Sequence, residues 1–171
     1  QSQHDECTFF HGKTIFIVYT DDTILLGPDK GEIDQLVKRL GKTFKIEDQG
    51  NLSDYLGIKI EKKPDGTLEW SQPTLTQSIL KDLKLDGEEI KGRQNKPNIK
   101  AVPANTSVPL TDHKDSPDHD PKEFNYRQVI GKLLYLEKST RPDISCEVHQ
   151  CARHCANPKI QHTAAVKRIG R

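Results

Sequence analysis

Residues 14–27 read TIFIVYTDDTILLG, and this stretch decides the fold. Two short apolar runs, rich in β-branched and aromatic residues, flank a polar Thr20-Asp21-Asp22 segment. Such runs are typical of strands, and three residues between them leave room only for a tight turn. We therefore predict a β-hairpin with two adjacent carboxylates at its tip.

The residues after this hairpin predict one helix and further short strands. Apolar residues at helical spacing over 33–40 predict an amphipathic helix, with Asp29 as its N-cap and Gly41 at its end. A turn is expected at 64–66. Strands are expected at residues 44–46, 55–61 and 68–70. Together these elements predict an α+β fold, with helices packed on one face of a mainly antiparallel sheet.

Beyond Trp70 the pattern becomes helical, with one interruption. Helical spacing is found over 75–83, 126–134, 144–155 and about 160–169, with a break between the second and third of these at Thr140-Arg141-Pro142. Residues 86–123 hold five of the ten prolines and little periodicity, which predicts a long loop or a partly disordered linker. The predicted domain organisation is 1–72, 73–85 as a first helix, 86–123 as a Pro-rich acidic linker, and 124–171 as a helical portion.

Composition excludes some classes of protein. The 171 residues are 33% hydrophobic and 30% charged, and no stretch approaches the roughly 20 apolar residues of a membrane-spanning helix. Four cysteines in a chain rich in lysine and glutamate do not predict a secreted disulfide scaffold, so we expect a reducing, intracellular location. The chain starts at Gln1 and contains no methionine, so we expect a fragment of a longer protein.

The net charge of +1 hides an uneven distribution. Residues 126–171 carry nine Lys or Arg against three acids, whereas residues 112–123 carry five acids and two lysines. A basic block beside an acidic segment suggests a polyanionic partner. A merely solvated helical face is the alternative, and charge alone favours it.

The carboxylates of Asp21 and Asp22 suggest metal binding. Carboxylate oxygens are hard ligands of the kind that Mg²⁺ prefers, and a rigid hairpin would hold both in place. Two-metal phosphoryl transfer needs such a cluster, with the ions roughly 3.5–4 Å apart and at least one further acid. The alternative is that the two aspartates simply serve as turn residues.

The hairpin resembles the Tyr-x-Asp-Asp box of reverse transcriptases of Ty1/copia-type retrotransposons, through Tyr19-Thr20-Asp21-Asp22 and its flanks. Further segments are similar to that family in the same order along nearly the whole chain. They are residues 2–9, 44–52, 55–58 (Tyr-Leu-Gly-Ile), 126–136, 140–144 (Thr-Arg-Pro-Asp-Ile), and Asn157-Pro158 with His162 and 167–169.

The resemblance implies part of an RNA-directed DNA polymerase: the later palm over 1–72, followed by a helical thumb. Asp21 would be the principal ligand and Asp22 the weaker ligand of two Mg²⁺ or Mn²⁺ ions. The partners would be an RNA or DNA template–primer and deoxynucleotides. The residues implied to contact nucleic acid are Tyr19 near the primer terminus, Leu56 and Gly57 in a primer-grip-like hairpin, and Lys132, Arg141, Lys167 and Arg168 on the basic helices.

The departures from the family pattern set further expectations. The family's other essential aspartate and its fingers lie upstream, and an RNase H domain lies downstream, so we expect this fragment alone to be inactive. Thr163 replaces a usual tryptophan and Gly170 an apolar residue, as in a decaying copy. The alternative function is a non-catalytic nucleic-acid-binding remnant or domesticated module. The resemblance implies a cytoplasmic location, in a virus-like particle, or a nuclear one.

Other chemistry-bearing residues have simpler interpretations. Lys45 would protonate leaving pyrophosphate or, as we favour, be a solvated strand lysine. A solvated tail is favoured over weak metal binding for His113 and His119 in the acidic linker. A zinc site is a weak alternative for a cluster of cysteines and histidines near the end of the chain. Their spacing fits no common zinc module, and two of the cysteines lie on the apolar face of a helix. The residues concerned are Cys146, His149, Cys151, His154 and Cys155.

Overall fold

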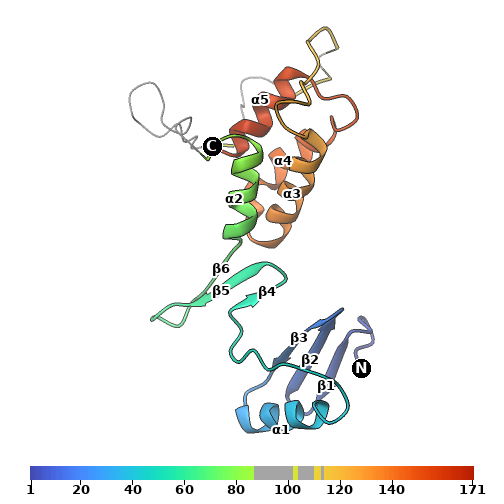
Figure 1. The fold of residues 1–171 in the computed structure, drawn as a ribbon, viewed down its shortest axis with the longest axis vertical. Coiled ribbons are helices and arrows are strands. Elements are labelled where there is room, and N and C mark those ends of the chain that lie inside the picture. The colour runs from blue at the N-terminus through green and yellow to red at the C-terminus, as the bar shows by residue number, and fades with distance from the viewer. Residues whose placement is uncertain (87–101, 104–109, 113) are drawn as a thin grey trace. The chain divides into compact units, whose positions relative to one another are not determined.

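The computed structural model describes residues 1–86, 102–103, 110–112 and 114–171 (Figure 1). These residues form two compact units, one made of 1–56 and 60–68 and the other of 57–59 and 69–171. Within the described residues the fold is α+β, with two small antiparallel sheets and five α-helices. The predicted class is therefore confirmed. No helix in these ranges has the length and apolar character needed to cross a membrane.

The predicted hairpin forms the centre of the first sheet. The strands are β1 (Thr8–His11), β2 (Thr14–Tyr19) and β3 (Asp22–Leu26), in the antiparallel order β1-β2-β3. Tyr19 pairs with Asp22, so the turn contains only Thr20 and Asp21, and Asp22 already belongs to β3. Thr20 has φ 50°, a left-handed conformation that a two-residue hairpin turn requires of at least one residue.

Helix α1 (Lys30–Leu40) follows the first sheet and has the predicted caps. The Asp29 side chain accepts a hydrogen bond of 2.7 Å from the backbone N–H of Gly31. Gly41 ends the helix with φ −63°, so its left-handed freedom is not used there. No residue of α1 is buried, although its apolar side chains are partly covered.

The second sheet differs from its sequence prediction. Its strands are β4 (Asp54–Tyr55), β5 (Ile58–Lys62) and β6 (Leu68–Ser71), in the order β4-β5-β6. The single strand predicted at 55–61 is wrong because Leu56 and Gly57 have φ values of 50° and 73°, the positive pair of a type I′ turn. The predicted turn at 64–66 and the last strand are confirmed.

The strand predicted at 44–46 is wrong. The backbone N–H of Phe44 donates to the carbonyl of Leu40 at 2.9 Å, so the chain is still leaving α1 at this point. A strand also needs a neighbour for its backbone groups, and no described residue pairs with 44–46. Phe44 and Ile46 are accordingly exposed.

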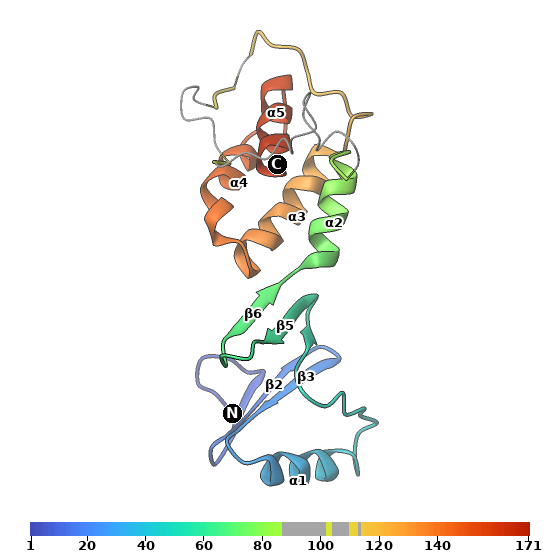
Figure 2. The same ribbon diagram turned by 90° about the vertical axis from the view of Figure 1, so that its left-hand side faces the viewer.

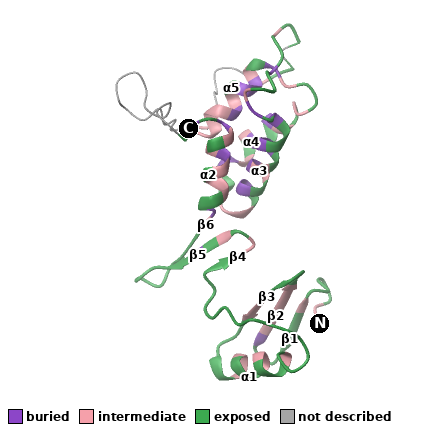
Figure 3. Ribbon diagram, viewed as in Figure 1, coloured by how far each residue is buried: buried purple, intermediate pink, exposed green. Residues whose placement is uncertain are grey.

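The second unit is a helical bundle that contains most of the buried core (Figures 2 and 3). Its elements are α2 (Pro73–Asp82), α3 (Tyr126–Ser139), the 3₁₀ turn η2 (Pro142–Ile144), α4 (Ser145–Ala152) and α5 (Ile160–Ile169). The helices match the predicted spacing. In the first unit, by contrast, the described residues that are buried are Thr14 and Ile60. Apolar packing therefore stabilises the helical unit far more than the sheet unit.

Part of the predicted linker, including His113, lies outside the described residues. Where it is described, the segment before α3 is packed. Asp118 forms an isolated β-bridge with Lys159, and His119 is 8% exposed. The expectation of a solvated tail is wrong for His119 because both its ring nitrogens have hydrogen-bond partners inside the protein, at 2.7 Å each.

Candidate metal and nucleic-acid site

The two predicted metal ligands lie at the end of the β2–β3 hairpin. Asp21 is in the turn, and Asp22 begins β3 directly opposite Tyr19. All three are exposed, Tyr19 by 56%. Neither carboxylate has a hydrogen bond or an ion pair among the described residues. The hairpin therefore presents two adjacent, uncompensated negative charges on a short, well-paired ribbon.

A second tyrosine, Tyr55, lies in the electrostatic field of this hairpin. Partial burial raises its pKa, and the nearby Asp22 and Tyr19 raise it further because negative charge disfavours the phenolate. Tyr55 is the last residue of β4, just before the left-handed turn at Leu56 and Gly57. The sequence identified Tyr55 only as part of a motif, and nothing in its spacing indicated that it would neighbour the carboxylates.

The carboxylates supply only part of a two-metal site. Mg²⁺ takes six oxygen ligands in a near-octahedral arrangement, usually one or two carboxylates with water and substrate phosphates. Asp21 and Asp22 fit that chemistry as hard anionic ligands, with no ion pair to a cation in the described part of the chain. Within the described ranges, no three His, Cys, Asp or Glu side chains come together as a metal site. Further acids are needed to hold two ions.

The cysteines and histidines of residues 146–155 do not form a metal site in the described structure either. Cys151 is 2% exposed in the helical core, and burial raises the pKa of its thiol to about 12. Burial also raises the pKa of Cys155, which packs against the same core. The described residues bring no group of three metal-ligating side chains together here, so both cysteines act as small apolar groups of the core.

Two of the predicted nucleic-acid cations have close acidic partners. Lys132 on α3 donates to Asp82 at 2.7 Å and to Ser78 at 2.7 Å, both on α2. Arg141 donates through two nitrogens to both carboxylate oxygens of Asp143, at 2.8 Å each. This bidentate contact lowers the pKa of Asp143.

The other two are also engaged. Lys167 lies 2.6 Å from Glu123, and Arg168 donates to the backbone carbonyl of Val102 at 3.1 Å. All four predicted cations therefore already have an intramolecular partner. Charge counting could not show this, because two of the three pairing acids are distant in sequence, with Asp82 lying 50 residues before Lys132.

The sequence did not single out the exposed face of α3. Arg127, Gly131, Tyr135 and Lys138 are exposed and are spaced by four, four and three residues, which places them on one face of the helix. Arg127 and Lys138 have no hydrogen bond or ion pair among the described residues. Gly131 has no atom within 4 Å of where a Cβ would lie, so the face is open at its centre. Helical spacing of exposed cations is the signal that could have found it.

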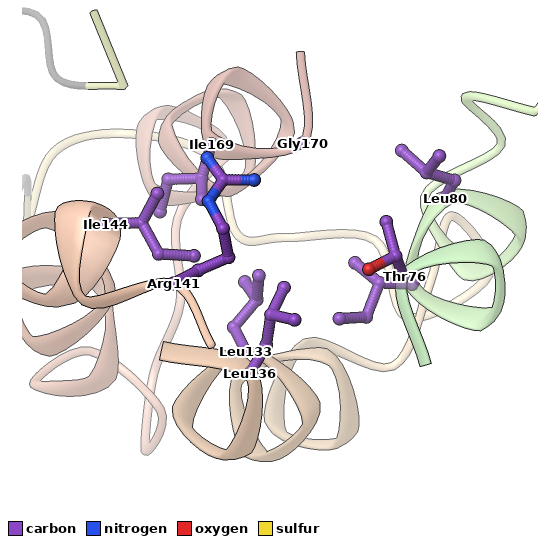
Figure 4. A pocket seen from close by; sticks show the side chains of 9 residues that line it. Thr76, Leu80, Leu133, Leu136, Arg141, Ile144, Ile169 and Gly170 are labelled. Atoms are coloured by element: carbon purple, nitrogen blue, oxygen red, sulfur yellow. The ribbon is translucent and has the colours of Figure 1, made fainter. Parts of the chain in front are cut away.

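Two further features are poor candidates for the site. Figure 4 shows a small cavity of about 70 Å³ inside the helical unit, between α2, α3, η2 and α5. Its lining is mostly aliphatic, with Arg141 but no carboxylate, so it offers no metal ligand set. Lys45 lies in the irregular segment after α1, not on the predicted strand, and is exposed.

Comparison with known proteins gives a consistent result. A family model described as "Reverse transcriptase (RNA-dependent DNA polymerase)" matches residues 6–93. This range includes the β2–β3 hairpin with Asp21 and Asp22 and the β4–β5 hairpin with Leu56 and Gly57. No solved structure is a significant match to the chain.

Curated relatives match over most of the chain. The Retrovirus-related Pol polyprotein from transposon TNT 1-94 of Nicotiana tabacum is 31% identical over 96% of this chain and 12% of the relative. The corresponding polyproteins from transposons RE2 and RE1 of Arabidopsis thaliana are each 32% identical, over 90% and 92% of this chain and 10% of each relative. The chain thus spans about a tenth of the length of these relatives.

Proposed function

Because this chain belongs to the reverse transcriptase (RNA-dependent DNA polymerase) family, we propose that it supplies part of the polymerase active site of a copia-type transposon Pol polyprotein. The observation that carries the proposal is the hairpin itself. It presents Asp21 and Asp22 side by side at the end of an apolar ribbon, exposed and with no ion pair to any described cation. A turn that served only to reverse the chain would not need two unneutralised carboxylates there.

In this proposal Asp21 is the principal metal ligand and Asp22 the weaker one. Asp21 and Asp22 would help to hold two Mg²⁺ or Mn²⁺ ions, whose charge would favour ionisation of the primer 3′-hydroxyl and offset negative charge on the α-phosphate and pyrophosphate. The paired strands restrict where the carboxylates can move. Tyr19 extends beside Asp22 on the same face of the sheet, where it would pack near the primer terminus.

The rest of the active site would come from chain outside these 171 residues. At least one more aspartate is needed for two ions, and the described residues bring no third acid to the hairpin. We therefore propose that residues 1–72 are a portion of a polymerase palm, with Leu56 and Gly57 in its primer grip. The isolated chain would then lack polymerase activity.

We propose that the helical unit acts as a thumb that contacts the backbone of the template–primer. Arg127 and Lys138 support this best, because both are exposed, have no partner among the residues that the structure describes, and lie on the open face of α3. Positively charged groups of this kind bind phosphates with little dependence on sequence. Lys132, Arg141, Lys167 and Arg168 would contact phosphate only by sharing or exchanging their present partners. We also propose that the polyprotein is located in the cytoplasm, within a virus-like particle, or in the nucleus.

Primer extension tests the enzymatic proposal against the non-catalytic one. The second candidate, a nucleic-acid-binding remnant, is favoured by the absence of a three-acid group in the described residues. The assay compares the chain alone with the chain plus the preceding polyprotein segment, supplied in trans. We expect synthesis only in the mixture. Template–primer binding without synthesis in either case would support the remnant instead.

Template–primer binding tests the thumb proposal separately. We expect the double substitution Arg127→Gln and Lys138→Gln to weaken binding and to reduce the salt dependence of affinity by about two charge equivalents. The matched control is Lys38→Gln with Arg39→Gln, which removes the same two charge types from the exposed face of α1. Equal losses in the two double variants would contradict a specific role for α3.

A further inference from the structure

Hydrogen bonds and ion pairs join the described segment before α3 to α5 and to the residues just before it. We call residues 110–112 and 114–124 the strap. Its backbone exchanges two hydrogen bonds with the start of α5, from Ile160 to the carbonyl of Pro117 at 3.0 Å and from His119 to the carbonyl of Pro158 at 2.9 Å. Side-chain contacts add to these bonds: Asp118 with Lys159 at 2.5 Å, Gln161 with Ser116 at 2.7 Å, and Glu123 with Lys167 at 2.6 Å.

One imidazole, that of His162, contacts the strap, the N-terminus of α5 and the turn that follows α4. Its Nδ1 accepts a hydrogen bond of 2.9 Å from the backbone N–H of Lys159, and its Nε2 lies 2.7 Å from the backbone carbonyl of Thr111 on the strap. The ring is fully buried, and it stacks on His154, in the turn after α4, with centroids 3.9 Å apart.

These partners fix the protonation state of His162. A backbone N–H can only donate and a backbone carbonyl can only accept, so Nδ1 must be bare and Nε2 must carry the hydrogen. A second proton on Nδ1 would set two donors against each other and break the cap of α5. It would also place a positive charge at a helix N-terminus, where the dipole disfavours it. The closed strap therefore requires a neutral His162.

His119 on the strap does not share this requirement. Its Nε2 donates to the carbonyl of Phe124, but its Nδ1 faces the hydroxyl of Thr163, which can either donate or accept. If His119 were protonated, Thr163 could accept from the ring and turn its own hydrogen toward the carbonyl of Lys159, 3.3 Å away. His119 tolerates both states without losing a bond.

The described titratable groups around His162 include His154, Asp112 and Asp118. The carboxylate of Asp112 on the strap lies 3.6 Å from Nδ1 of His154. Two charged imidazoles stacked in contact would repel each other. Asp118 is already paired with the ammonium of Lys159, the residue that caps α5.

We propose that His162 is a proton-sensitive latch that holds the strap on α5 at neutral pH and releases it on acidification. Ordinary imidazoles gain a proton between about pH 7 and 6, and the open form is the one that can take it. Each proton bound only by the open form raises the opening equilibrium about tenfold per pH unit below that range. Release would fray the start of α5 and free Lys159 and Lys167 from their strap carboxylates.

Hydrogen exchange of the full 171-residue chain tests the latch. The readout is the protection of the backbone amides of His119 and Ile160, corrected for intrinsic exchange, at pH 7.5 and 5.5. We expect protection to fall about tenfold in the wild type. His162→Gln keeps a side-chain acceptor for the N-cap amide but does not titrate, so its protection should be nearly independent of pH. His11→Gln, at an exposed histidine of β1, should behave like the wild type.

Two results would overturn the proposal. One is protection in the wild type that does not change between the two pH values. The other is the same pH dependence in His162→Gln as in the wild type. If His162→Gln does not fold, ¹⁵N spectra of histidine-labelled wild type decide instead. The latch predicts a neutral Nε2–H imidazole for His162 until the strap amides lose protection, and a charged imidazole with intact protection refutes it.

Discussion

The contact between Lys132 and Asp82 should stabilise the bundle measurably. The ammonium of Lys132 lies 2.7 Å from the carboxylate, and the two side chains are 24% and 30% exposed, so solvent screens the pair only in part. Fully exposed pairs contribute about 0–1 kcal/mol, and hydrogen bonds to charged groups about 1.5–3 kcal/mol. We therefore predict a coupling free energy of about 1 kcal/mol.

A double-mutant cycle measures this coupling. The variants are Lys132→Met, Asp82→Asn and the combination, with the free energy of unfolding taken from urea titrations followed by helical circular dichroism. Methionine keeps an unbranched side chain but removes the ammonium, with its hydrogen bonds to Asp82 and Ser78, and the double variant cancels the part that does not involve Asp82. Additivity of the two single changes to within about 0.3 kcal/mol would refute the reasoning, because sites without interaction add to that accuracy.

The same variant separates a structural role for Lys132 from a nucleic-acid role. Asp82 neutralises its charge, whereas Arg127 has no such partner among the described residues. We therefore expect Lys132→Met to lower stability while changing template–primer affinity less than Arg127→Gln does. An affinity loss as large as that of Arg127→Gln would show that the ammonium exchanges Asp82 for phosphate.

Three further predictions concern packing, reactivity and capping. Tyr126→Phe removes the 3.0 Å hydrogen bond to the buried carbonyl of Cys151 and should lower the free energy of unfolding by about 1 kcal/mol, read from the urea midpoint. At pH 8 a thiol reagent should label Cys7 and Cys146 fast and Cys151 only after unfolding, because burial raises the pKa of Cys151 to about 12; rapid labelling of Cys151 would contradict its burial. Asp29→Ala should destabilise α1 by about 1 kcal/mol, seen as faster amide exchange in that helix, and unchanged exchange would refute the cap.

Elements with strong local signals were predictable from the sequence. The apolar runs around Asp21 and Asp22 fixed the first hairpin, because short connections leave antiparallel pairing as the only arrangement. Asp29 and Gly41 marked the ends of α1, because capping depends on residues next to the helix.

Elements that depend on a partner or on an unusual backbone were not predictable. Leu56 takes a left-handed conformation that leucine rarely adopts, so residues 55–61 looked like one strand. Residues 44–46 have strand-like composition but no described neighbour to pair with. The composition of these two segments is like that of a true strand. It cannot show whether a turn interrupts the segment or whether a neighbouring strand is there to pair with it.

The sequence predicted only part of the candidate site. It identified the two carboxylates of the hairpin, but it did not show that the predicted cations are already bound to other residues of the chain. Lys132 and Lys167 are paired with Asp82 and Glu123, which are distant in sequence. His119 was assigned to a solvated tail because its neighbours are acidic, yet it is buried, and its ring is hydrogen-bonded to Thr163, which lies 44 positions away.

The rate of nucleotide incorporation after substitution of Asp21 tests the central claim most directly. The chain is combined with the preceding polyprotein segment. Asp21→Asn is compared with Asp65→Asn, a matched change in the exposed turn between β5 and β6. If Asp21 binds the catalytic metal, Asp21→Asn should lower the rate by about a hundredfold or more, and Asp65→Asn should leave it nearly unchanged. Synthesis by Asp21→Asn at the rate of Asp65→Asn would contradict the account.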